Sequence, residues 1–339
     1  MGVKIRDIAD KLGVSPGTVS KALNDRKGVG DKLKAKIKRV AKEMEYHPNP
    51  IARRLSMNKS NTIGVFILSR DKIRLRESFA IEILDGVAEE ANKRGYDILL
   101  FTNTSSLYQN VNYLKLCKER RVEGAIFFGL ALNDPELEEI KQADIPVAII
   151  DLKIKGENIG YISSDNPTGI NQALDYLTEL GHQRVGFFKS TKEAEVSEIR
   201  FRAYQDYLLE RNLYNPAYVW EGDFTKESGE RLAQEVLSLK QRPTAILSAN
   251  DSMALGAMGT FKAAGLKIPD DISLVGFDNM PATQYTSPKL TTINQDGILF
   301  GKEAVNFILN KLNTNSVEVV KEKLLKPELI IRNSVKDLR

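Results

Sequence analysis

The fold of the N-terminal segment is decided by the stretch IRDIADKLGVSPGTVSKALN, residues 5–24. Apolar residues at positions 5, 8, 9 and 12 repeat at helical spacing and predict one buried helix face. Gly13 lies where that helix would end, because glycine readily adopts the left-handed conformation of a helix C-terminus. Ser15 and Pro16 form an N-cap and first-turn pair, which predicts that a second helix starts here. The stretch therefore predicts two short helices joined by a tight turn.

Two helices joined in this way are typical of the helix-turn-helix, whose second helix enters the major groove of DNA. A generic two-helix hairpin of an α-helical protein is the alternative on this stretch alone. A third helix is expected over about residues 31–45, where apolar positions 33, 37, 40, 41 and 44 can close a small three-helix core. Its outer face is rich in lysine and available to phosphates.

Basic charge is concentrated at this end of the chain. Residues 1–60 hold 15 Lys and Arg against 6 Asp and Glu, a net charge of +9, whereas the other residues hold 34 against 39, a net charge of −5. Attraction of DNA phosphates requires such a basic segment. A merely solvated basic surface would not explain why the rest of the chain is acidic.

Composition excludes several classes of protein. The 339 residues are 42% hydrophobic and 28% charged, as in ordinary soluble proteins of two or three domains. No 18-residue apolar run and no signal peptide are recognisable, so we expect a cytoplasmic protein without a membrane segment. With one cysteine, Cys117, and two histidines, we expect no disulfide, no metal site and no cofactor. Phosphate-binding loops and nucleophile elbows are also missing, which argues against an enzyme.

A different pattern begins at Thr62. Short apolar runs alternate with helix-period segments; the runs are residues 63–68, 96–101, 124–128, 147–150, 184–188, 244–248 and 272–277. Apolar strands that alternate with helices predict parallel sheets covered on both faces. Residues 61–339 are too many for one sheet of ordinary size, so two similar lobes are expected.

The motifs of the N-terminal segment resemble those of the LacI/GalR family of bacterial transcriptional repressors. The matching patterns within residues 5–55 are I-x-D-I-A, G-V-S-x-x-T-V-S-x-A-L-N and Y-x-P-N-x-x-A-x-x-L. The resemblance continues through D-N-x-x-G at 165–169, L-G-H-x-R-V at 180–185, N-D-x-M-A at 250–254, D-I-S-L-V-G-F-D at 271–278 and R-x-S at 332–334. It therefore covers nearly the whole chain.

This resemblance implies an α/β fold with three parts. An all-α helix-turn-helix headpiece would span residues 1–48, a hinge helix and linker residues 49–60, and a two-lobed effector and dimerisation domain like a periplasmic binding protein residues 61–339. The expected lobes are about 61–161 plus 291–322, and about 162–290 plus 323–339.

The resemblance also implies DNA contacts. The matching positions are Lys4, Ser15, Pro16, Gly17, Thr18, Ser20, Lys21, Asn24, Tyr46, Asn49, Ala52 and Leu55. Leu55 would be the leucine wedge that kinks the minor groove, although it could also be an ordinary linker leucine. Pro16 and Gly17 replace residues that usually vary with specificity and offer no side-chain hydrogen bond. Lys21 replaces the commoner arginine, so bidentate reading of guanine is lost.

An effector site is expected between the lobes, at the carboxyl ends of the strands. The residues that match the family there are Phe79, Phe128, Asp151, Arg200, Phe224, Asn250 and Asp278. Carboxylate and amide groups beside aromatic rings suit a sugar or sugar phosphate, and a purine-like planar ligand is second. The alternatives are a turn cap for Asp278, a helix N-cap for Asn250, a surface ion pair for Arg200 and core positions for the three phenylalanines.

The sequence thus predicts a homodimeric DNA-binding transcriptional repressor that binds a near-palindromic operator under allosteric control by a small molecule. A cytoplasmic solute-binding protein without DNA function is the alternative.

Overall fold

The computed structural model describes residues 3–25, 27–46, 60–68, 79–102, 112–313 and 321–339. Contacts within the chain divide it into two compact units, residues 1–60 and 61–339. The expected hinge helix, with Asn49, Ala52 and Leu55, lies outside the described residues.

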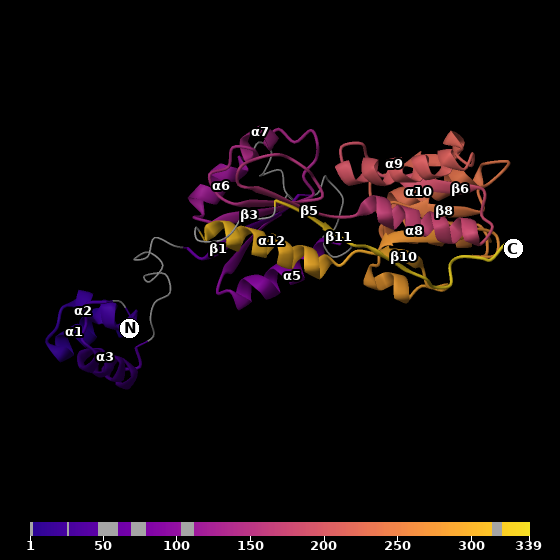
Figure 1. Cartoon of the computed structure of the whole chain (residues 1–339). Helices are drawn as coiled ribbons and strands as arrows, with labels where there is room; N and C mark the ends of the chain where they lie inside the picture. The colour runs from indigo at the N-terminus through magenta and orange to yellow at the C-terminus, as the bar shows by residue number, and fades with distance from the viewer. Residues whose placement is uncertain (1–2, 26, 47–59, 69–78, 103–111, 314–320) are drawn as a thin grey trace. The chain divides into compact units, whose positions relative to one another are not determined.

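The headpiece helices of the first unit are α1 (Ile5–Leu12), α2 (Pro16–Leu23) and α3 (Asp31–Glu43), drawn in indigo in Figure 1. Gly13 ends α1 with a φ of 64°, and the Ser15 side chain caps α2 by accepting from Thr18 N. Its core consists of Ile8, Ala9, Val19, Ala22, Ile37, Val40 and Ala41. The predicted three-helix arrangement is confirmed.

The first lobe of residues 61–339 is built on a six-stranded sheet in the order β11-β5-β4-β3-β1-β2. Its strands, all paired in parallel, are β1 (Thr62–Ile67), β2 (Asp97–Thr102), β3 (Gly124–Phe128), β4 (Val147–Ile150), β5 (Ile159–Ser164) and β11 (Glu322–Leu325). Its helices are α5 (Ala80–Lys93), α6 (Tyr113–Glu119), α7 (Leu137–Ile140) and α12 (Gly297–Leu312). Residues of α5 and α12 pack in one core cluster and residues of α6 and α7 in another, so both faces of the sheet are covered.

The second lobe repeats this plan with the strand order β12-β10-β9-β8-β6-β7. Its strands are β6 (Val185–Lys189), β7 (Val219–Glu221), β8 (Ala245–Ser248), β9 (Ser273–Asp278), β10 (Thr291–Asn294) and β12 (Glu328–Ile330), and only β12 is antiparallel to its neighbour. Its helices are α8 (Asn166–Glu179), α9 (Glu195–Glu210), α10 (Lys226–Leu237) and α11 (Asp251–Ala263), with short 3₁₀ turns η3 (Pro216–Tyr218) and η4 (Pro281–Gln284).

Over the described residues the chain crosses between the lobes three times, and the crossings differ from the expected boundaries. Residues 162–164 complete β5 in the first sheet, 291–294 form β10 in the second, and 323–325 belong to β11 in the first. The chain leaves each sheet only after the last paired residue of the strand. Leu325, the last residue of β11, for example, pairs with Ser164, the last residue of β5. In Figure 1 the yellow C-terminal segment passes from β11 in one lobe to the chain end in the other.

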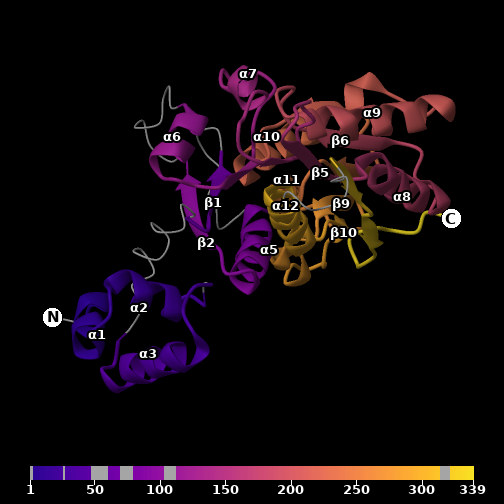
Figure 2. The same ribbon diagram turned by 60° about the vertical axis from the view of Figure 1, so that its left-hand side comes forward.

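Helices α5 and α12 lie side by side in both views (Figure 2). Glycines permit this close approach, because a Cβ atom at Gly86 would overlap the carbonyl oxygen of Ile298 and one at Gly301 would overlap that of Ile83. Among the described residues, no helix is long and apolar enough to cross a membrane.

Candidate functional site

A cavity of about 250 Å³ is lined by residues of both lobes in the unit 61–339. All seven residues predicted from the sequence line it: Phe79, Phe128, Asp151, Arg200, Phe224, Asn250 and Asp278. Phe128 and Asp278 are the last residues of β3 and β9, and Asp151 directly follows β4. The cavity therefore lies at the carboxyl ends of the strands, where open α/β sheets bind ligands.

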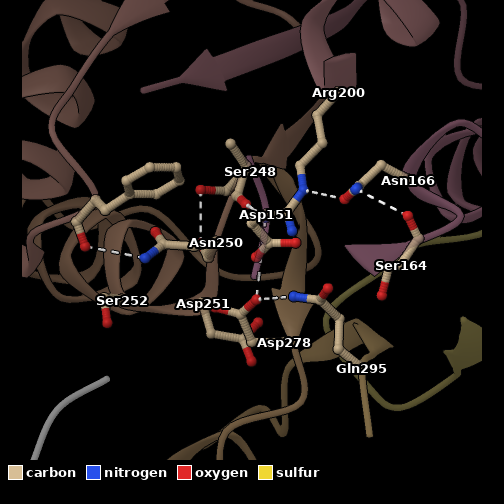
Figure 3. Close-up of polar contacts among 12 residues, drawn as sticks. Asp151, Ser164, Asn166, Arg200, Ser248, Asn250, Asp251, Ser252, Asp278 and Gln295 are labelled. Atoms are coloured by element: carbon tan, nitrogen blue, oxygen red, sulfur yellow. Dashed lines mark hydrogen bonds and ion pairs between the residues drawn. The ribbon is translucent and has the colours of Figure 1, made fainter. Parts of the chain in front are cut away.

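Arg200 is the central polar side chain of this cavity (Figure 3) and is only 2% exposed. Its Nε atom donates to Asn166 Oδ1 at 2.7 Å, and its Nη1 atom donates to the carbonyl oxygen of Ala249 at 2.6 Å. Its guanidinium lies over the ring of Phe277, 3.8 Å from the ring centroid. The alternative of a surface ion pair is therefore wrong: this cation is buried, oriented by its neighbours, and within 4.0 Å of Asp278 Oδ1.

Asp278 is 6% exposed and accepts a hydrogen bond from Gln295 Nε2 at 2.7 Å. Burial raises the pKa of Asp278 to about 7, although Arg200 and the Gln295 hydrogen bond act in the opposite direction. Burial likewise lowers the pKa of Arg200, against the attraction of Asp278 and Asp151. The cavity therefore contains a carboxyl group that is costly to ionise without a ligand.

The turn that carries Asp278 is fixed by a second buried carboxylate, Asp251. Asp251 Oδ2 accepts from the backbone N–H of Met280 at 2.7 Å, and Asp251 Oδ1 accepts from the Thr292 hydroxyl at 2.6 Å. Burial raises the pKa of Asp251 well above its usual value, and the charge of Asp278 adds to this effect. Because both its oxygens have protein partners, Asp251 holds the turn in place.

Three of the predicted residues have an unusual backbone conformation. Asp151, Phe224 and Asp278 have φ values of 64°, 66° and 114°, where side chains other than glycine are uncommon. Such strain persists only when the surroundings enforce it, and it is concentrated at functional sites. These three residues line one cavity, whereas the other described non-glycine residues with positive φ lie outside its lining.

Asn250 caps a helix, as one reading of its sequence context predicted, and it also lines the cavity. Its Oδ1 atom accepts from the backbone N–H of Met253 at 3.0 Å, which makes it the N-cap of α11. Its Nδ2 atom donates to the carbonyl oxygen of Phe224 at 2.9 Å, and the residue still lines the cavity. The amide is thus held in a fixed orientation with one N–H remaining for another acceptor.

On the first lobe, Asp151 accepts from the Ser163 hydroxyl at 2.6 Å. Burial raises its pKa, while Arg200 and the Ser163 hydrogen bond oppose the shift. Phe79 is 7% exposed and packs edge to face on Phe128 and Phe300. Phe79 is therefore a core residue, Phe128 packs against that core, and both also line the cavity.

Sequence reasoning missed several polar residues of the lining, chiefly Gln295, Glu193 and Asp223. Gln295 is 2% exposed, and its Oε1 atom is buried without a hydrogen-bond partner. It directly follows β10 at a crossing between the lobes. A polar residue directly after a strand was the available signal, but β10 (TTIN) was too short and polar to be predicted as a strand.

Two hydrogen bonds join the lobes beside the cavity. The backbone N–H of Leu132 donates to the carbonyl oxygen of Glu193 at 2.8 Å, and that of Lys153 donates to Glu195 Oε2 at 2.6 Å. Glu193 lies just before α9, and Glu195 is the first residue of that helix. The two walls of the cavity are therefore held together on this side.

The headpiece presents most of the residues predicted to contact DNA on or near α2. Ser15, Pro16, Gly17 and Lys21 are exposed, whereas Thr18, Ser20 and Asn24 are half-buried. The other described members are Lys4, which is exposed before α1, and Tyr46, which packs against the headpiece core.

Two family models match the chain. Residues 4–49 match the model described as bacterial regulatory proteins, lacI family. Residues 174–335 match the model described as a periplasmic binding protein-like domain.

Full-length relatives give the same result. The chain is 32% identical to the HTH-type transcriptional repressor PurR of Vibrio campbellii, over 98% of this chain and 99% of that protein. The crystal structure of the lac repressor dimer bound to operator and the anti-inducer ONPF is 28% identical, with a TM-score of 0.84 over 99% and 100% of the two chains. The transcriptional regulator CelR–cellobiose complex is 26% identical, with a TM-score of 0.74 over 98% and 99%.

A helix-turn-helix headpiece, followed by a two-lobed domain with a cavity between its lobes, defines the class of DNA-binding transcriptional repressors that have a ligand-binding domain. This chain belongs to the LacI family of bacterial regulators. Its homologues are repressors rather than enzymes, as the sequence predicts.

Proposed function

We propose that this repressor binds a small polyhydroxylated effector in the cavity between its lobes and that the effector controls operator binding. The observation that carries the proposal is that all seven residues predicted from separate parts of the sequence line one cavity. Its volume of about 250 Å³ is close to the lower limit of ligand pockets, about 300 Å³, and so fits a small ligand.

The hydrogen-bonding groups of the cavity favour hydroxyl groups. Asp278 keeps one carboxylate oxygen without a protein donor, and Gln295 Oε1 is buried without a partner. A sugar hydroxyl can donate to such an acceptor and accept from the remaining N–H of Asn250. We therefore assign Asp278, Gln295 and Asn250 to hydroxyl binding.

Charge distinguishes a neutral sugar from a sugar phosphate. Over the described part of the lining, four carboxylates, those of Asp151, Glu193, Asp223 and Asp278, face one guanidinium, that of Arg200. Two donor atoms of Arg200 already have protein acceptors. These described residues are more acidic than basic and offer a phosphate few free donors, so we take the neutral sugar as the better candidate.

A planar, purine-like ligand is the second candidate. The rings of Phe79, Phe128 and Phe224 line the cavity together with aliphatic side chains, and a flat heterocycle can pack on such a wall. This candidate explains the aromatic wall but uses fewer of the buried acceptors than a sugar does.

For DNA, we propose that α2 reads the major groove through Ser15, Pro16, Gly17, Thr18, Ser20, Lys21 and Asn24, with Lys4, Tyr46 and Asn49 near the backbone. A homodimer would present two such helices to a near-palindromic operator in the cytoplasm, as two-fold symmetry requires. Ala52 and Leu55 would act in the minor groove. Replacing Leu55 by alanine should then lower operator affinity without changing effector binding; unchanged operator affinity would remove Leu55 from the interface.

Thermal unfolding of the full-length protein tests the effector class. Glucose, ribose and cellobiose are compared with glucose 6-phosphate, ribose 5-phosphate, nucleosides and purine bases. A ligand at ~100 times its Kd adds about 2.7 kcal/mol of stability, which is readily measured. Each compound that stabilises the protein is then added to an operator-binding titration by fluorescence anisotropy.

We expect a neutral sugar to raise the unfolding temperature and to change operator affinity. Replacing Asp278 by alanine should remove both effects, whereas replacing the exposed Asp206 of α9 should remove neither. Stabilisation by a phosphorylated sugar alone would contradict the charge argument. A ligand that binds but leaves operator affinity unchanged would contradict effector control.

A further inference from the structure

The exposed start of α2 has few side-chain groups with which to read base edges. Pro16 has no hydrogen-bonding side chain, and Gly17 has no side chain. The Ser15 hydroxyl lies 2.9 Å from the Thr18 hydroxyl and also accepts from Thr18 N at 3.1 Å, so both hydroxyls are engaged in capping the helix. This end of α2 is therefore largely apolar toward an approaching ligand.

The second half of α2 contributes one long donor. The amide of Asn24 donates to the carbonyl oxygen of Ser20 at 2.9 Å, so part of its hydrogen-bonding capacity is used inside the headpiece. Lys21 is exposed and has no hydrogen-bond or ion-pair partner among the described residues. Its ammonium is thus the one long cationic group on this helix that can reach a base acceptor.

Nothing inside the headpiece requires a glycine at position 17. Gly13 has a φ of 64°, which favours glycine, but Gly17 has ordinary helical geometry. A Cβ atom at Gly17 would meet only Ser15 Oγ, at an ordinary contact distance of 3.7 Å. Glycine also forms helices less well than alanine. A glycine that weakens the helix, and that no contact within the protein requires, indicates that position 17 is adapted to a binding partner.

We propose that the Pro16–Gly17 edge of α2 selects a thymine, by receiving its 5-methyl group against the proline ring and the bare backbone of Gly17. The proposal rests on DNA binding by the headpiece. Among the four bases, thymine alone presents an apolar group in the major groove. The first residues of a recognition helix lie at the base edges, so a side chain at position 17 would occupy the space that the methyl group needs.

Lys21 supplies the hydrogen bond that accompanies this contact. An ammonium can donate to the O6 and N7 acceptors of guanine but lacks the two-pronged geometry of arginine. The half-site should therefore combine one thymine read by shape with one less strictly specified guanine.

The test begins with selection of binding sites from a random duplex library by the full-length protein. Each thymine of the selected half-site is then replaced by deoxyuridine, which removes only the methyl group. Affinities are measured by fluorescence anisotropy for the wild-type protein and for Gly17→Ala. Gly259→Ala, a change on an exposed position of α11, is the matched control.

At one thymine of each half-site we expect deoxyuridine to lower wild-type affinity about fourfold, as the loss of one buried methyl group predicts. Gly17→Ala should lower affinity for the thymine site about tenfold and should abolish the difference between thymine and deoxyuridine. Its unfolding temperature should not fall, so lost binding cannot be attributed to misfolding. Gly259→Ala should bind as the wild type does.

Three results would overturn the proposal: no invariant thymine in the half-site, deoxyuridine without effect at every thymine, or an unchanged methyl effect in Gly17→Ala. Failure of DNA recognition itself gives a different result, because no sequence would then be enriched from the library.

Discussion

Replacing Asp278 by asparagine should stabilise the ligand-free protein, and more so at high pH. Burial raises the pKa of Asp278 from 3.8 to about 7, so the folded state binds this proton more tightly than the unfolded state does. The contribution of Asp278 to the free energy of unfolding therefore falls as the pH rises from about 4 to about 7, and above that pH it stays constant. Each unit of pKa difference corresponds to 1.36 kcal/mol, so relative to acid pH, where the group is protonated in both states, stability falls by about 2 kcal/mol at pH 5 and by about 4 kcal/mol at pH 8.

Asparagine imitates the uncharged carboxyl group and tolerates the positive φ at this position. It can still accept a hydrogen bond from Gln295. We expect Asp278→Asn to be more stable than the wild type by up to about 4 kcal/mol at pH 8, with the difference shrinking by about 2–3 kcal/mol at pH 5. The gain should be accompanied by weaker effector binding, because one charged acceptor is lost.

Urea unfolding at pH 5 and pH 8, followed by circular dichroism, measures these differences. Asp206→Asn, an equivalent change at an exposed position of α9, should change stability by less than about 0.5 kcal/mol at either pH. The reasoning fails if Asp278→Asn is less stable than the wild type at pH 8, or if the two proteins show the same pH dependence.

Other predictions concern packing and capping. Gly86→Ala should destabilise the protein by about 1–3 kcal/mol or more, because its Cβ atom would overlap the carbonyl oxygen of Ile298. Gly259→Ala, which has open space around it, should stabilise the protein by about 1 kcal/mol. Both variants gain helix propensity, so a comparison of their thermal unfolding isolates the effect of the clash. Ser15→Ala should destabilise the headpiece by about 1 kcal/mol through loss of the cap on Thr18 N, visible as faster amide hydrogen exchange in α2 with unchanged exchange in residues 61–339.

The strands and most of the cavity could be predicted because buried parallel strands are apolar and end at the ligand side. Asp278 ends a fully buried strand, so its position at that edge could be inferred from pattern alone. Strand β11 (EKLL) could not be found in this way, since three of its four residues are exposed at the edge of the sheet. Its membership depends on pairing with β5, a contact between residues far apart in the sequence.

The headpiece was predictable in more detail than the lobe boundaries for a related reason. Helix capping by Ser15 and the left-handed turn at Gly13 are local interactions within a few residues. The crossings between lobes depend instead on which sheet a short strand pairs with, as β10 and β11 show. Interactions between residues close in sequence determine the headpiece helices, whereas pairing between distant strands determines the lobe boundaries.

Gln295 lies both in the cavity lining and in a segment that joins the two lobes. It lies between β10 of the second lobe and α12 of the first, and its amide donates to the carboxylate that we assign to the effector. A hydroxyl donated to its unpaired Oε1 atom would therefore act on a segment that joins the lobes. Asp296, the next residue, caps α12 by accepting from the backbone N–H of Leu299. Gln295, one of the lining residues that sequence patterns missed, is thus placed where the proposed effector would contact a segment that joins the two lobes.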